Sequence, residues 1–528
     1  MKMRKSTKIL KVIFVIPFSF GNSEERSVCA MDGSCSAVVL FTCLVSIILV
    51  VVGTFSGLHR FNEVSMKVIW GLIVTLVTIA TINIILILIL LQNRRFRITS
   101  PRVEMDALTK LQLRFLWLFG IGLLLRTSLS IAIDIECVVQ GFVASYIAGI
   151  FSSAIMIVFI ISQIGLITYM QNIKFMHSAW VYFSIGIVLL ANVSIWFNFA
   201  AVGIAEILHR TETNTSSVPN ISTVITESNN NYASCFFHSK IYSFATKLKP
   251  YLFQVSLDFL LLATLFIVRT LPSCGILRQN TYLYLQNISI ENKSTTHIMD
   301  QRKSAVISMA IGLVLHIPFL VMALVIRFVF IDNIYNIREI WQNLVIFQKV
   351  LMSTAIFVAF SHIRDIKTDS GVWRLGASDY VLLSCSVGKV VMQAFDILTA
   401  TYCAEIHILL SKGLISLVFY FYQTLYILIS KRSSPSFRNQ SNVVVFVHVL
   451  LLTLSVTQWI TTTFILSVQG NFVLNEGIGC LFESPIVWKV LQYISVPFTM
   501  YYDFQSAMHN YSILPTLDSL IMGKKIAF

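Results

Sequence analysis

The chain has 528 residues, of which 56% are hydrophobic and only 12% are charged, and its formal net charge is +14. Its mean hydropathy of +0.78 is too high for a soluble domain to bury, so the sequence predicts a protein whose solvent is lipid. The apolar blocks are about 18–29 residues long, enough to cross roughly 30 Å of hydrocarbon as helix. They do not alternate in polarity, which excludes the strands of a membrane barrel.

Twelve such blocks predict an all-α polytopic membrane protein with twelve transmembrane helices. The expected spans are Ala37–Phe55, Val68–Leu91, Phe115–Ile133, Phe142–Met170, Trp180–Leu208, Tyr251–Val268, Ala305–Ile331, Ile340–Phe360, Tyr380–Tyr402, Ile406–Ser430, Val443–Ile465 and Val487–His509. The sequence has no nucleotide-binding glycine loop and no metal-ligand spacing among its nine cysteines. We therefore expect no enzyme, no cofactor and no metal site.

Basic residues gather in alternate connections between these spans and in both terminal tails. Examples are Arg94 and Arg95 after the second span, and Lys431 and Arg432 after the tenth. The positive-inside rule therefore predicts that both termini of this multi-pass protein lie in the cytoplasm. Because topology accounts for the positive charge, we expect no nucleic-acid partner.

The predicted outer loops carry features of an extracellular face. Asn214 and Asn220 begin glycosylation sequons in the long loop after the fifth span, so we expect a glycoprotein. The apolar run Ile9–Phe20 resembles part of a signal peptide, but we interpret it as an interfacial segment, because cleavage would spoil the charge pattern. One or two disulfides are open to the cysteines in or near outer loops, which are Cys137, Cys235, Cys403 and Cys480.

A pattern recurs in the chain: a glutamine within a span, a tryptophan 33 or 36 residues later, and a proline near the start of the next apolar stretch. The two copies are Gln163, Trp196 and Pro250, then Gln423, Trp459 and Pro497. We expect structural roles for these tryptophans and prolines, and the repeat predicts two pseudo-symmetric six-helix halves. The expected parts are a cytoplasmic N-terminal segment 1–36, an N-terminal half 37–268, a cytoplasmic linker 269–304, a C-terminal half 305–509 and a cytoplasmic tail 510–528.

Ionisable residues inside the spans are the first candidates for chemistry, because charge in hydrocarbon is expensive. Arg126 and Asp134 lie on the third span. Lys389 and Asp396 lie on the ninth span, the equivalent helix of the second half. The spacing lets the members of each couple face the same interior. Each couple is either a structural pair or a charged gate.

Asp258 and Asp503 have no cation close by on their own helix, so we favour a role as proton acceptors. The neutral amides of Gln163, Gln423 and Asn192 either join helices by hydrogen bonds or hold a short chain of waters. Their recurrence in both halves favours a polar interior path. The candidates for sensing external pH are Glu206, His238 and His407.

Several short stretches follow one another in an order typical of one known family. The stretch Pro497–Ser506 is similar to that family's last-helix pattern Pro-Leu-x-Ile-Phe-Tyr-Arg-Phe-His-Ser. The other stretches are Asn192 with Trp196, Pro250–Ser256, Asp379–Leu383 and Tyr422–Leu425. On these motifs the chain resembles the otopetrins, which are twelve-span proton channels, across spans three to twelve.

The chain departs from the family pattern at several polar positions. Gln254 stands at the family's sixth-helix Glu, and Asp258 supplies an acid one turn deeper on nearly the same face. Asp503 and Gln505 stand at the twelfth-helix Arg and His, and Ser455 stands at the Asn before the eleventh-helix Trp. These departures indicate a divergent member of the family.

The resemblance implies a homodimer, with protons, membrane lipid and sterol-like lipids as partners. We expect a proton-selective ion channel of the plasma membrane that opens in extracellular acid. The alternatives are a secondary solute transporter and a non-conducting receptor or scaffold. The expected proton path comprises Gln163, Asn192, Gln254, Asp258, Gln423, Ser455, Asp503 and Gln505.

Overall fold

The computed structural model of the chain describes residue 45 and residues 63–92, 107–139, 143–171, 183–199, 240–270, 295–328, 334–363, 377–402, 407–433, 442–466 and 485–514. Within these ranges the protein is all-helical and contains no strand. Nine of the described helices are long and apolar enough to cross a membrane. The all-α class is therefore confirmed for this part of a membrane protein.

The nine helices coincide with nine of the predicted spans, namely the second to fourth and the sixth to eleventh. The fifth span corresponds to the shorter apolar helix Phe183–Phe199, and the twelfth to α16 (Pro485–Ile513). The first span lies outside the described residues, apart from Val45. The number twelve thus stays a prediction.

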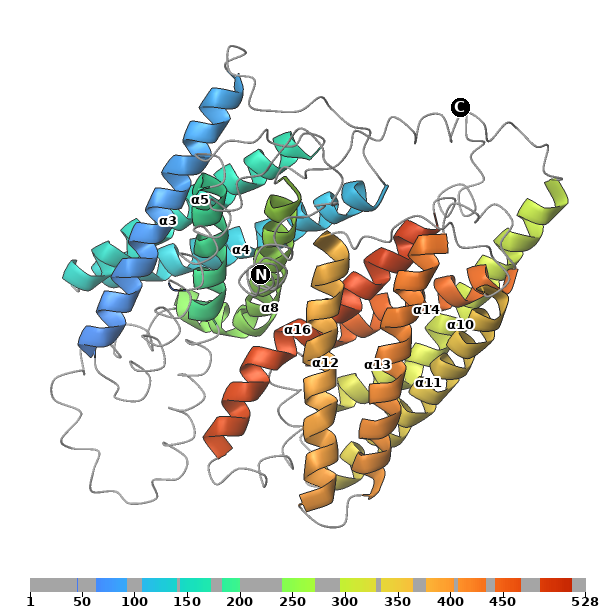
Figure 1. Cartoon of the computed structure of the whole chain (residues 1–528). Coiled ribbons are helices and arrows are strands. Elements are labelled where there is room, and N and C mark those ends of the chain that lie inside the picture. The colour runs from blue at the N-terminus through green and yellow to red at the C-terminus, as the bar shows by residue number, and fades with distance from the viewer. Residues whose placement is uncertain are drawn as a thin grey trace, which may run out of the picture. The chain divides into compact units, whose positions relative to one another are not determined.

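The chain divides into two compact units, residues 1–279 and 280–528. In unit 1 the described helices are α3 (Glu63–Gln92), α4 (Ala107–Val139), α5 (Val143–Met170), Phe183–Phe199 and α8 (Lys240–Thr270). Helix α3 packs against α5, α5 against α4, and α4 against α8. The α4 helix therefore has α5 and α8 as its neighbours (Figure 1).

Unit 2 contains α10 (Thr295–Phe328), α11 (Ile334–Ile363), α12 (Ala377–Tyr402), α13 (His407–Ser433), α14 (Asn442–Ile460) and α16. Helix α11 packs against α13, α13 against α12, and α12 against α16, while α14 packs against both α10 and α16. In chain order α11, α12, α13 and α16 correspond to α3, α4, α5 and α8. The same three helix pairs are therefore packed in both units (Figure 1).

Glycines let the central helix of each unit approach its neighbour closely. A Cβ added at Gly122 of α4 would lie 2.5 Å from Val255 Cγ1 of α8. One added at Gly388 of α12 would lie 2.7 Å from Phe498 Cβ of α16. Small residues at helix crossings let backbones pack closely where lipid provides no hydrophobic drive. The α4–α8 and α12–α16 pairs both pack closely at such a small residue.

The start of α8 and the end of α14 differ from the ends that hydropathy predicts for these helices. The sequence predicts a span that begins after Pro250, but α8 begins at Lys240 and carries Pro250 in its interior. The helix continues through this residue because proline removes a single backbone hydrogen bond, and membrane helices tolerate such a loss.

Helix α14 continues as the π-helix η2 (Thr461–Leu466), where the Thr461 hydroxyl lies 2.7 Å from His316 Nε2.

Gly388→Ala should destabilise the protein by about 1–3 kcal/mol, because the new methyl group would overlap Phe498 and force α12 and α16 apart. The matched control is Gly165→Ala on α5, where no atom lies within 4 Å of the added Cβ. Thermal unfolding in detergent measures the melting temperatures of both variants and of the unchanged protein. Equal melting temperatures for the two variants would contradict the close α12–α16 crossing.

Candidate functional site

Unit 1 buries the three amides predicted for its polar path. Gln163 on α5, Asn192 on Phe183–Phe199 and Gln254 on α8 are each 0% exposed. Gln254 donates a hydrogen bond of 3.1 Å to Asp258, which is also fully buried. Both amide atoms of Gln163 and of Asn192 lack a protein partner among the described residues. An unsatisfied buried polar group costs about 1–3 kcal/mol, so these amides favour an ordered water wherever the packing leaves room for one.

Unit 2 also buries the neutral polar residues predicted for its part of the path. Gln423 on α13, Ser455 on α14 and Gln505 on α16 are buried. Neither amide atom of Gln505 has a partner in the described part of the chain, and the same holds for Gln423 Oε1. Both units therefore hold buried amide groups that packing alone does not satisfy.

The two tryptophans of the repeat are buried among aromatic rings. Trp196 meets Phe197 edge-on at 5.0 Å between ring centroids. Trp459 packs against Phe464 and Phe504 at 5.9 and 5.4 Å. These contacts fit the structural role expected for them. Of the two prolines, Pro497 lies inside α16, as Pro250 does in α8.

The buried acids of unit 2 are paired across helices. Lys389 of α12 contacts Asp503 of α16 at 2.9 Å, and Lys412 of α13 contacts Asp396 of α12 at 2.8 Å. This corrects the expected same-helix couple of Lys389 and Asp396. Residues seven apart are separated by about 10 Å along a helix axis, whereas neighbouring helices bring their charges into contact.

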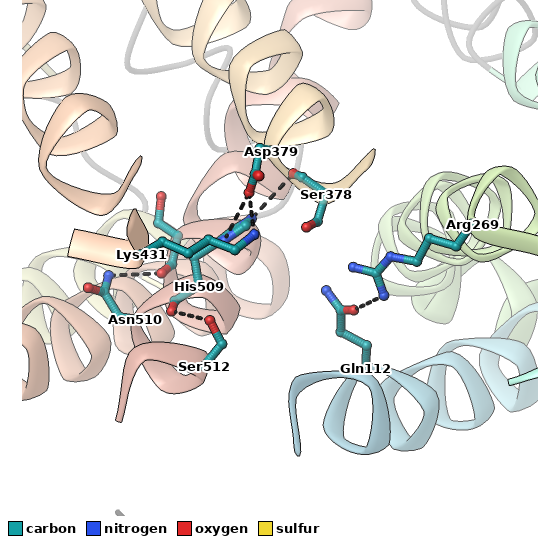
Figure 2. Close-up of polar contacts among 9 residues, drawn as sticks. Gln112, Arg269, Ser378, Asp379, Lys431, His509, Asn510 and Ser512 are labelled. Atoms are coloured by element: carbon teal, nitrogen blue, oxygen red, sulfur yellow. Dashed lines mark hydrogen bonds and ion pairs between the residues drawn. The ribbon is translucent and has the colours of Figure 1, made fainter. Parts of the chain in front are cut away.

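A third charged cluster, which the sequence reasoning missed, lies where α12 begins (Figure 2). Lys431 Nζ of α13 lies 2.6 Å from Asp379 Oδ1, and His509 Nδ1 of α16 lies 3.8 Å from the same oxygen. His509 Nε2 is 3.3 Å from the backbone oxygen of Ser378. The sequence did contain a signal for this pair. Asp379 lies in the first turn of α12 and Lys431 near the end of α13, and these two ends meet when consecutive helices are antiparallel.

The three pairs lie at successive levels of α12, because Asp379, Lys389 and Asp396 all belong to this helix. From Asp379 to Asp396 the helix rises about 25 Å, most of the roughly 30 Å of membrane hydrocarbon. Asp379 is near one end of the helix, Lys389 near its middle, and Asp396 nearer the other end. We call this arrangement the α12 charge line.

Further polar contacts lie within the same unit. Thr424 of α13 and the Tyr502 hydroxyl of α16 share a hydrogen bond of 2.8 Å. His448 Nδ1 of α14 lies 2.8 Å from Asn510 Oδ1 of α16. All four residues are buried. The interior of unit 2 is thus polar at several depths, and its donors and acceptors come from three helices.

A cavity of about 130 Å³ lies beside the Lys389 and Asp396 levels of the α12 charge line. Its walls come from α11, α12, α13, α14, η2 and α16, and they include both charged pairs Lys389–Asp503 and Lys412–Asp396. A cavity of this size with polar walls has room for several waters.

The charged residues of unit 1 are arranged differently. The Arg126 guanidinium stacks over Phe199 at 4.0 Å and lies 5.5 Å from the Phe253 ring centroid. The Asp134 carboxylate approaches Gly149 of α5 so closely that an added Cβ would lie 2.6 Å from it. At another point of α4, Arg269 of α8 donates a hydrogen bond of 2.7 Å to Gln112 (Figure 2).

Several predicted residues lie at or beyond the limits of the described structure. His407 is the first residue of α13 and is exposed. Cys137 at the end of α4 is disulfide-bonded. The positions outside the described residues are Glu206, Asn214, Asn220, Cys235, His238, Cys403, Cys480 and most of the segments 1–36, 269–304 and 510–528.

Comparison with models of known protein families finds no match, and comparison with curated proteins finds none either. In the described part of the chain, no group of three histidine, cysteine or acidic residues could hold a metal ion. The interpretation of the site therefore depends on its own geometry.

Lys389→Met should lower the free energy of unfolding by about 3–5 kcal/mol, because it leaves the Asp503 carboxylate buried without its cation. Adding Asp503→Leu should recover part of this loss, since an apolar pair replaces the ion pair. Chemical denaturation in detergent measures the free energy of unfolding of each variant. Lys303→Met, at an exposed position, is the control. Equal stabilities of the single and double variants would contradict the pairing.

Proposed function

We propose that the protein conducts protons across the plasma membrane as a proton-selective channel, in line with its resemblance to the otopetrins. The observation that carries the proposal is the α12 charge line, whose three levels cover about 25 Å. Buried ionisable groups inside a membrane span mark ion or proton pathways by default. Carboxylates, a histidine and waters within such a line can accept and release protons in sequence.

The same line provides a reason for selectivity. A metal ion that entered would encounter only carboxylates that a lysine already neutralises, so none is left to replace its shell of water. A proton avoids this requirement because it moves by transfer between groups rather than as a free cation. The unsatisfied amides of Gln163, Asn192 and Gln505 support waters that complete the path in both units.

External acid reaches the Asp396 level first in the predicted topology, in which α12 runs from cytoplasm to exterior. Protonation of Asp396 removes the charge that holds Lys412 and loosens α13 from α12. The Asp379 cluster, with His509 beside it, lies toward the cytoplasm. We propose the Asp396–Lys412 pair as the acid-sensitive gate, with His407 at the nearby outer end of α13.

Two further parts of the proposal concern architecture. The recurring pairs α3–α5, α4–α5 and α4–α8, with their counterparts in unit 2, support two pseudo-symmetric six-helix halves. The disulfide at Cys137 supports an extracellular position for the end of α4, since disulfides persist in oxidising surroundings. We propose cytoplasmic termini on the distribution of basic residues, and a homodimer and surrounding sterol-like lipid on the resemblance alone.

The alternative of a secondary solute transporter has one observation in its favour, the cavity of about 130 Å³ among five helices of unit 2. Transporters bind substrate near the bilayer midplane between helices that move. The two functions differ in one requirement, because a transporter moves protons only together with a solute.

In voltage-clamped cells that express the chain, external acid should evoke a current without any added solute. Its reversal potential should shift by about 60 mV per pH unit, because a tenfold proton ratio corresponds to about 1.4 kcal/mol and a unit charge gains about 2.3 kcal/mol per 100 mV. Replacing external sodium with a large organic cation should leave the reversal potential unchanged. A reversal potential that followed sodium would contradict proton selectivity.

Neutral variants should identify which unit carries the current. Asp503→Asn in unit 2 and Asp258→Asn in unit 1 each remove one buried acid, and we expect at least a tenfold loss of current where that acid is on the path. Glu339→Gln, at an exposed position of α11, is the matched control. Surface labelling must show equal expression. Full current in both Asp variants would remove the acids from the mechanism.

A further inference from the structure

The cavity in unit 2 contains one more cation than its carboxylates can pair. Lys389 and Lys412 pair with Asp503 and Asp396, and these are the two acids in the cavity wall. Lys349 of α11 also lines the cavity and is only 7% exposed. No carboxylate of the described residues lies within ion-pair distance of Lys349. If all five groups are ionised, the cavity has a surplus of one positive charge.

Aromatic rings compensate only part of this charge. Lys349 Nζ lies 4.1 Å from the Phe419 ring centroid and 4.7 Å from that of Tyr420. Such contacts offset only part of the cost of removing an ammonium group from water. A buried, unpaired lysine therefore favours a bound anion.

We propose that this cavity binds a short monocarboxylate anion, with Lys349 as its principal cation. One negative charge balances the surplus of one positive charge. The Tyr420 ring contacts both Lys349 and Lys389, so a carboxylate beside Lys349 also lies in the field of the second lysine. This site goes beyond proton conduction, because it depends on the charge of the cavity and not on the passage of protons.

Size and lining limit the ligand. An engineered cavity of about 150 Å³ holds benzene, so a cavity of about 130 Å³ suits a ligand of about four to six non-hydrogen atoms. Val345, Met392 and Val496 provide an apolar part of the wall that an inorganic anion would leave unused. These features favour a carboxylate with a short carbon chain over chloride.

Two acceptor atoms in the wall indicate what else the ligand should carry. Gln393 Oε1 and Asp396 Oδ1 are buried and have no hydrogen-bond partner in the described residues. A hydroxyl group on the ligand can donate a hydrogen bond to one of them. Lactate combines a carboxylate, a hydroxyl and a methyl group in six non-hydrogen atoms, so it is the probe of choice.

The test is thermal unfolding of the purified full chain in detergent with sodium lactate, lactamide or sodium chloride at matched ionic strength. A ligand that binds only the folded state raises the melting temperature in a saturable way. We expect this rise with lactate and not with lactamide, which has the same shape but no charge, or with chloride. An equal rise with lactamide or chloride, or none with lactate, would overturn the proposal.

Variants of Lys349 locate the site. Lys349→Gln should weaken lactate binding at least tenfold while leaving the protein at least as stable without ligand, because it removes an unpaired charge. Lys349→Arg should retain binding, and exposed Lys303→Gln is the control. Unchanged lactate binding in Lys349→Gln would place the anion elsewhere. Because the assay measures no current, failure of this site and failure of proton conduction give separate results.

Discussion

Charge buried in a membrane protein is costly unless it is paired, and the pairing in unit 2 determines much of its internal arrangement. Lys389 with Asp503 joins α12 to α16, Lys412 with Asp396 joins α13 to α12, and Lys431 with Asp379 joins the same two helices at the other end. Each pair contributes little net stability, because desolvation offsets most of the attraction. Their effect is to fix which helices are neighbours and at what register, so that the polar groups lie in one line.

The same arrangement explains how one bundle can hold both a proton line and a ligand cavity. The paired acids are available for proton transfer, whereas Lys349 is the cation that the pairing leaves over. The buried polar groups of unit 1 differ from those of unit 2. Asp258 is fully buried and accepts a hydrogen bond from Gln254, and two amides have no protein partner in the described chain. If both units conduct, unit 1 does so through amides and water, and unit 2 through ion pairs.

Hydropathy was enough to predict nine of the described helices that are long and apolar enough to cross a membrane, because long apolar runs are a local property of the chain. Burial of Gln163, Asn192 and Gln505 also followed from their position in such runs. The partners of Lys389 and Asp396 did not, because Lys389 and Asp503 are 114 residues apart and only the packing of α12 on α16 brings them together. Lys349 and Lys412 could have been noticed as charges within predicted spans, but the cavity between them depends on five helices at once.

The most direct test of the central claim is proton flux through the purified chain in lipid vesicles that contain a pH-sensitive dye and no other solute. A potassium gradient with valinomycin sets an inside-negative potential, which should draw protons in and acidify the lumen. We predict acidification that depends on the protein and is lost in Asp503→Asn, without any added lactate. Vesicles that acidify only when lactate is supplied, or not at all, would contradict a proton channel.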